Sequence, residues 1–293
     1  MHRVVVALVL CLVVTLGSRP PMADSARAEA APDRQGEADL ALVVSVDVSE
    51  SVDDHRYALQ MDGIAKALED PAVISSITSG PKGAIYFAMV AWADRSEVAV
   101  PWVHIAGRED AERVAARVRG LKRYGGEFTC LARMLRSIHP FLVSGLKSPP
   151  ARVVVDVSGD GIDNCGTDEA TRAARDELVA AGVTINGLPI IEEPDRIVGS
   201  GAYRAPGGGL DYLRPLESRE QLTLEDWYRA YVMGGDHSFI LPANGYADFA
   251  RAMRQKFVTE ISGIGPTPPG PGGPSGRATT LAEPLPGRRI ARR

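Results

Sequence analysis

Residues 38–51 read ADLALVVSVDVSES, an almost unbroken apolar run that ends in a cluster of acidic and hydroxyl side chains. A continuous apolar run of this length is typical of a strand buried on both faces of a parallel sheet. In open α/β sheets, ligands bind outside the carboxyl ends of the strands. The stretch therefore predicts an α/β fold and also the edge of the sheet where a site would form.

Strands and helices alternate along the rest of the chain. Further strands are predicted at residues 84–92, 97–103, 152–157, 183–188 and 238–240, and helices at 53–69, 107–119, 130–138, 168–181, 227–232 and 246–261. Pro140 is expected to stop the helix that begins near Cys130. Such alternation implies a mostly parallel sheet with helices on both faces. We therefore expect a single doubly wound, Rossmann-like α/β domain over residues 38–262.

The two ends of the chain differ in composition from the middle. Residues 1–30 combine a basic start, a short apolar run and A-x-A sites, which are the parts of a secretory signal peptide. Because the apolar run at 4–17 is shorter than the ~20 residues that span a bilayer, we expect cleavage rather than an uncleaved anchor, and no membrane span in the mature chain. Residues 264–293 are rich in Pro and Gly and predict a disordered basic tail. Residues 192–217 predict an irregular loop or lid insertion.

Charge and cysteine content exclude several functional classes. The chain carries a formal charge of −4; the leader carries +1 and the tail +4, so residues 31–263 carry −9. An acidic domain does not suit nucleic acid, which needs a basic surface. Three cysteines are too few for a disulfide scaffold. We expect an exported protein, periplasmic or secreted, that does not bind nucleic acid.

Three polar clusters fall at the ends of predicted elements. They are residues 47–51 after the first strand, 125–129 before a helix, and 158–161 after the strand at 152–157. Carboxylates and hydroxyls from separate loops suit a hard divalent cation, because Mg²⁺ prefers octahedral oxygen ligation and keeps some of its waters. No His and Cys residues occur at zinc spacing. The clusters predict a Mg²⁺ site, which Mn²⁺ or Ca²⁺ could also fill.

The same clusters carry a family resemblance. Asp47-x-Ser49-x-Ser51, the Thr of the second loop and the Asp-Gly of the third resemble the metal-ion-dependent adhesion site of von Willebrand factor A domains. Further phrases resemble more closely the exported bacterial family catalogued as domain of unknown function 1194 (DUF1194), over about residues 38–262. They are WA at 92–93, VPW at 100–102, DVSGDG at 156–161, INGLPI at 185–190 and MGG at 233–235.

The resemblance implies a set of metal ligands. Hydroxyl ligands would come from Ser49, Ser51 and Thr129, and carboxylates, acting directly or through water, from Asp47 and Asp160. One coordination position would stay open for an acidic residue of a partner.

Some of these residues depart from the pattern or have a simpler interpretation. Glu50 and Phe128 stand where the family often has Gly. Ser51 alternatively acts as the N-cap of the following helix. The pair Asp160-Gly161 alternatively forms only a turn.

Cys130 and Cys165 remain after removal of the leader, both in loops at the proposed metal face. Two cysteines often pair in an oxidising compartment. A bridge would join the start of the helix after Thr129 to the loop of Asp160. Two unpaired thiols are the alternative, because the geometry between them is not readable from the sequence.

The sequence favours a protein-binding module over an enzyme. In such a module, an Asp or Glu of an unknown protein partner would complete the coordination of the metal. A metal-dependent hydrolase is the alternative, since Asp47 follows the first strand as phosphatase nucleophiles do; phosphatases of the haloacid-dehalogenase type, however, need a second Asp where Ser49 stands. Ser158 lacks the G-x-S-x-G elbow, and no P-loop occurs. A third alternative is a structural envelope protein with a vestigial site.

Overall fold

The computed structural model describes residues 36–146, 148–193, 198 and 222–263. The predicted leader, the predicted tail and most of the 192–217 insertion lie outside these residues. The described chain forms a five-stranded sheet in the order β3-β2-β1-β4-β5. The strands are β1 (Leu40–Asp47), β2 (Ile85–Trp92), β3 (Ser96–Ile105), β4 (Val153–Gly159) and β5 (Val183–Pro189).

The sheet is parallel except at one edge, as predicted. β1 pairs in parallel with β2 and β4, β4 pairs in parallel with β5, and β3 runs antiparallel to β2. Every residue of β1, β2 and β4 is buried, which explains their continuous apolar sequences. β3 is partly exposed and contains Pro101, a residue that an edge strand tolerates because it has no N–H to donate.

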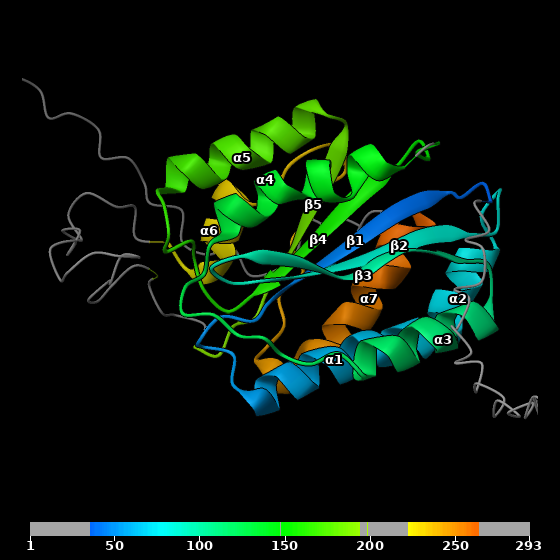
Figure 1. Ribbon diagram of the computed structural model, residues 1–293, viewed down its shortest axis with the longest axis horizontal. Coiled ribbons are helices and arrows are strands. Elements are labelled where there is room, and N and C mark those ends of the chain that lie inside the picture. The colour runs from blue at the N-terminus through cyan, green and yellow to red at the C-terminus, as the bar shows by residue number, and fades with distance from the viewer. Residues whose placement is uncertain (1–35, 147, 194–197, 199–221, 264–293) are drawn as a thin grey trace, which may run out of the picture. The chain divides into compact units, whose positions relative to one another are not determined.

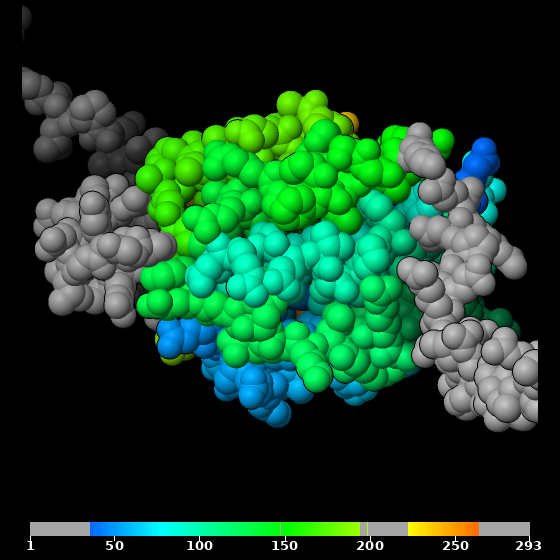
Figure 2. Space-filling view, viewed as in Figure 1, coloured from blue at the N-terminus to red at the C-terminus, as the bar shows by residue number. Residues whose placement is uncertain are grey.

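Helices cover both faces of the sheet (Figure 1). One face carries α1 (Asp54–Glu69), α2 (Pro71–Thr78), α3 (Arg108–Arg119) and α7 (Phe249–Ser262); the other carries α4 (Leu131–Phe141), α5 (Asp168–Ala180) and α6 (Leu224–Tyr231). The edge strand β3 forms the band that is visible between the two helix layers (Figure 2). Each face has its own apolar cluster, and β1 supplies both, with Val44 and Val46 on one side and Ala41 and Val43 on the other. In the described part of the chain, no helix has the length and apolar character needed to cross a bilayer.

One suggested helix cap and one predicted helix end were wrong. The N-cap of α1 is Asp53, whose carboxylate accepts a hydrogen bond from the Arg56 N–H at 2.8 Å, so Ser51 is not the cap. Helix α4 continues through Pro140 to Phe141 instead of stopping before the proline. Near the end of a helix, Pro140 removes only one backbone hydrogen bond, which the last turn tolerates.

Two other elements differ from the prediction. The short helix α2 was missed, although Asp70 accepts a hydrogen bond from the Ala72 N–H at 2.8 Å and Pro71 occupies the first turn, a recognisable start signal. The predicted strand at 238–240 forms only an isolated bridge, between Ile240 and Gly187 of β5. Three residues beside an edge strand are too few to build a ladder of their own.

Candidate metal centre

The first loop of the site begins where β1 ends. β1 has parallel partners on both sides and lies at the point where the strand order reverses, which is where open α/β sheets bind ligands. Asp47, its last residue, is fully buried. Its Oδ1 accepts a hydrogen bond from the Ser49 N–H at 2.8 Å, whereas its Oδ2 has no hydrogen-bond partner in the described chain.

All five predicted ligand residues come together in one hydrogen-bonded chain. Thr129 Oγ1 lies 3.2 Å from Ser49 Oγ, and Ser49 Oγ lies 3.3 Å from Ser51 Oγ. Ser51 Oγ donates to Asp160 Oδ1 at 2.7 Å, across 109 residues of sequence. Asp160-Gly161 is therefore more than a turn, and the hydroxyl of Ser51 faces the third loop.

The electrostatics of the cluster favour a cation. Burial, followed by the negative charge of Asp160, raises the pKa of Asp47 to about 7, against the hydrogen bonds of Ser49 and the charge of Arg123. A buried carboxylate oxygen without a partner is costly unless a charge or a hydrogen bond compensates it. Residues 47, 49, 51, 129 and 160 offer only oxygen atoms, as hard divalent cations prefer. No group of three or more His, Cys, Asp and Glu side chains that could hold a metal occurs among the described residues.

Arg123 holds the first loop from outside the ligand set, and the sequence analysis missed it. Its Nη2 donates to the carbonyl oxygens of Val48 at 3.2 Å and Ser49 at 2.9 Å. Its positive charge lowers the pKa of Asp47. Arg123 is more than 70 residues away from this loop in the sequence, so no local sequence pattern reveals the contact.

Asp160 has two further neighbours that the sequence analysis missed. The Tyr246 hydroxyl donates to Asp160 Oδ2 at 2.9 Å, and Arg56 Nη1 lies 3.9 Å from the same oxygen. Burial, followed by the charge of Asp160, raises the pKa of Tyr246. Arg56 also donates to Glu192 at 2.7 Å. Arg56, Glu192 and Tyr246 line a groove of about 550 Å³ beside α1, with Leu59 supplying apolar surface.

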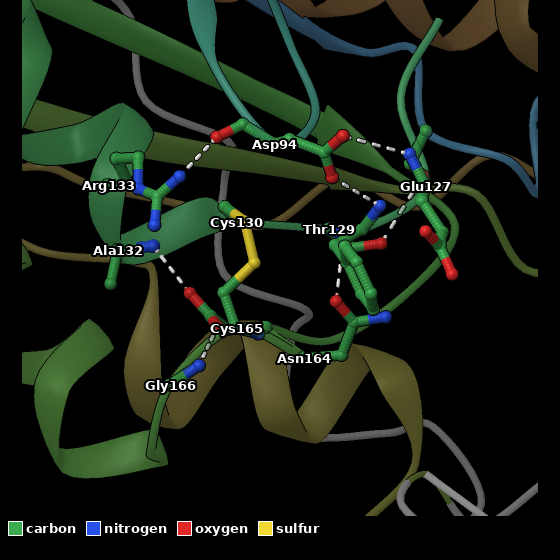
Figure 3. Close-up of a disulfide and its surroundings, with 12 residues drawn as sticks. Asp94, Glu127, Thr129, Cys130, Ala132, Arg133, Asn164, Cys165 and Gly166 are labelled. Carbon is green, nitrogen blue, oxygen red and sulfur yellow. Dashed lines mark hydrogen bonds between the residues drawn. A yellow bond between two sulfur atoms is a disulfide. The ribbon is translucent and has the colours of Figure 1, made fainter. Parts of the chain in front are cut away.

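The second loop is shaped by Asp94, which follows β2 (Figure 3). The Asp94 carboxylate accepts hydrogen bonds from the backbone N–H groups of Glu127 at 3.1 Å and Phe128 at 2.7 Å. Gly126 is required here, because a Cβ at that position would lie 2.4 Å from the Ala93 Cβ. The second loop therefore packs closely against the residues that follow β2, next to Thr129.

The second and third loops are joined covalently. Cys130 and Cys165 form a disulfide with a Cα–Cα distance of 5.0 Å, which is the pairing that the sequence favours (Figure 3). Asn164 Oδ1 accepts from the Thr129 N–H at 2.8 Å, and Asp163 Oδ2 accepts from the Ala132 N–H at 2.6 Å in the first turn of α4. The Asp-Asn pair just after Asp160-Gly161 is a turn-forming signal that could have drawn attention to it.

A doubly wound sheet with these three loops at its switch point defines the class of the protein, a von Willebrand factor A-like α/β domain. The sequence profile described as "Protein of unknown function (DUF1194)" matches residues 37–265, and the chain belongs to this family. No curated protein matches the chain in sequence.

Solved structures share the fold at low sequence identity. Proximal thread matrix protein 1 from the mussel byssus is 14% identical, with a TM-score of 0.52, over 78% of this chain and 49% of the mussel protein. A further structure of that protein, 15% identical with a TM-score of 0.51 over 78% and 48% of the two chains, has a zinc-occupied MIDAS motif. The pilus adhesin SpaC from Lactobacillus rhamnosus GG is 11% identical, with a TM-score of 0.52, over 78% of this chain and 31% of the adhesin. The chain thus spans about half of the mussel protein and under a third of the adhesin, and the likeness shows the fold alone.

Proposed function

We propose that this chain is an exported, non-enzymatic binding module that holds a divalent cation, most suitably Mg²⁺, and binds a partner protein through an Asp or Glu side chain. The proposed ligands are Asp47, Ser49, Ser51, Thr129 and Asp160. The observation that carries the proposal is the buried Asp47 Oδ2, which has no partner in the described chain, although Asp47 is linked through Ser49 to a cluster of three hydroxyls and a second carboxylate.

The chemistry of this cluster suits a module that binds another protein. Two carboxylates offset the charge of a divalent ion, and Mg²⁺ keeps part of its hydration shell, which a carboxylate from outside can replace. Ser51 is exposed while Asp47 is buried, so the cluster reaches from the core to the surface. The zinc-occupied MIDAS motif of the mussel byssus protein supports a divalent cation in general.

Metal binding is tested by the thermal and urea stability of the purified domain with and without Mg²⁺. We expect Mg²⁺ at 100 times its Kd to raise the free energy of unfolding by about 2.7 kcal/mol. Asp47→Asn should abolish this gain. Asp156→Asn is the matched control, because Asp156 is equally buried on the neighbouring strand β4 but outside the cluster, and it should keep the gain. Equal stabilisation of Asp47→Asn and the wild-type domain would refute the metal site.

The acidic partner is tested separately. A protein captured from an envelope extract should bind in Mg²⁺, fail to bind in chelator or to Asp47→Asn, and lose binding when one of its own Asp or Glu residues is changed to the amide. Binding that survives all three changes would contradict the proposal. Hydrolysis of phosphate or carboxylate esters that requires Asp47 would favour the metal-dependent hydrolase instead.

A further inference from the structure

Tyr228 in α6 carries a buried polar group that no contact described above explains. Its side chain is fully buried, and its ring packs against that of Trp227 with the ring centroids 5.7 Å apart. Its hydroxyl has no hydrogen-bond partner among the described residues. Leaving a buried hydroxyl unpaired is costly, so it calls for a partner that is close by.

Gly159, the last residue of β4, shows where that partner lies. A Cβ on Gly159 would lie 2.8 Å from the Tyr228 hydroxyl oxygen and 3.1 Å from Asp47 Oδ2. Both atoms are buried and both lack a partner in the described chain. Both atoms therefore lie close to one point beside the Gly159 Cα, and a side chain at residue 159 would crowd them.

The two groups are chemically complementary. A carboxylate oxygen accepts hydrogen bonds, and a tyrosine hydroxyl, with an ordinary pKa near 10, donates one. A buried water held by two polar groups could also bridge them. In either arrangement the donor belongs to Tyr228 and the final acceptor is Asp47.

We propose that Tyr228 is a positioning residue of the metal centre, whose hydroxyl donates a hydrogen bond to Asp47 Oδ2 directly or through one buried water. This bond fixes the orientation of the carboxylate, in the way that outer-sphere hydrogen bonds fix the ligands of metal sites. The link also connects α6 to the first loop. Its effect on metal affinity rests on the proposed function, but the hydrogen bond itself is a property of the metal-free protein.

The first experiment measures Mg²⁺ affinity by calorimetry for wild type, Tyr228→Phe and Tyr231→Phe. Tyr231 is the matched control, because it lies in the same helix and its ring also packs on Trp227, with centroids 5.5 Å apart. We expect Tyr228→Phe to raise the Kd about 10- to 100-fold, as loss of an outer-sphere partner does.

Tyr231→Phe should leave the Kd unchanged. Circular dichroism in chelator verifies that both variants fold. An unchanged Kd in Tyr228→Phe would overturn the role of the hydroxyl in positioning the metal ligand.

The second experiment separates this inference from the metal proposal. In the metal-free protein, proton NMR should show a slowly exchanging hydroxyl resonance that Tyr228→Phe removes and Asp47→Asn shifts. A hydroxyl resonance that Asp47→Asn leaves unmoved, or one lost to fast exchange with solvent, would overturn the hydrogen bond. If wild type binds no metal but the resonance responds to Asp47→Asn, the proposed function fails and the link between Tyr228 and Asp47 stands.

Discussion

Gly159 lies where β4, α6 and the end of β1 meet, and its missing side chain leaves room for two polar groups. A Cβ would come within 3.1 Å of Asp47 Oδ2 and even closer to the Tyr228 hydroxyl. We expect Gly159→Ala to lower the free energy of unfolding by about 1–3 kcal/mol, the usual cost of overpacking. Urea unfolding in chelator measures this cost without any contribution from a metal.

The source of that cost can be identified with a double variant. Tyr228→Phe removes the oxygen nearest to the added methyl group, so Gly159→Ala should cost less in the Tyr228→Phe background than in wild type. Such non-additivity is expected for residues in contact. Strictly additive losses would show that the added methyl group is accommodated by the backbone and not by the Tyr228 hydroxyl.

Among the elements, α7 is anchored to β4 by a buried ionic group. Lys256 Nζ lies 2.9 Å from Glu260 Oε1 on the same helix and 3.2 Å from Asp156 Oδ1 on β4. All three side chains are buried from solvent. Asn186 of β5 also donates to Glu260 Oε1, at 2.8 Å. One lysine faces two carboxylates, so the group holds either an extra negative charge or an extra proton.

This arrangement gives the fold a pH dependence. Burial, together with the charge of Glu260, raises the pKa of Asp156 to about 7 against the opposing effect of Lys256. The folded protein then keeps a proton that an unfolded Asp releases near pH 4. The free energy of unfolding should therefore fall as pH rises from about 4 to about 7, by up to ~1.4 kcal/mol per pH unit.

Comparison with Asp156→Asn isolates this contribution. Asp47, whose pKa is also raised, contributes in the same direction in both proteins. Urea unfolding in chelator across this pH range should show a flatter dependence for Asp156→Asn than for wild type. Parallel curves would mean that Asp156 is ionised in the folded protein throughout.

Local sequence predicted most of the elements but not the contacts between them. The apolar run of β1 predicted the sheet, and its polar end predicted the edge at which residues 47–51 meet the other two loops, because burial and strand polarity are local signals. The supporting residues come from elsewhere in the chain: Tyr246 reaches Asp160 across 86 residues. The N-cap of α1 shows that even a local feature can depend on a distant contact. Ser51 and Asp53 are equally good cap residues by type, but the Ser51 hydroxyl donates its hydrogen bond to Asp160, and Asp53 caps the helix.

On the scale of the whole molecule, the disulfide and the predicted leader both point to a chain that reaches an oxidising compartment. The Cys130–Cys165 bond closes a loop of 35 residues and joins two of the three loops that meet at the candidate site. In the chain-entropy account such a closure stabilises the fold by about 4 kcal/mol. Disulfides persist in oxidising compartments, where a secretory signal would deliver the chain. We propose that residues 1–30 direct export and that oxidation follows there.

Production of the chain in bacteria with and without residues 1–30 tests this proposal. With the leader, we expect an exported protein whose N-terminus, by Edman sequencing or mass spectrometry, is residue 29 or 31, with no free thiol. Without it, the cytoplasmic protein should have two reactive thiols and a free energy of unfolding lower by about 4 kcal/mol, because the same fold lacks the cross-link.

The Cys130→Ala/Cys165→Ala variant, exported with its leader, should be as unstable as the cytoplasmic form. Retention of residues 1–30 at the membrane would show that they act as an anchor, and equal stability of the oxidised and reduced forms would mean that the hydrogen bonds of Asp163 and Asn164 hold the two loops on their own.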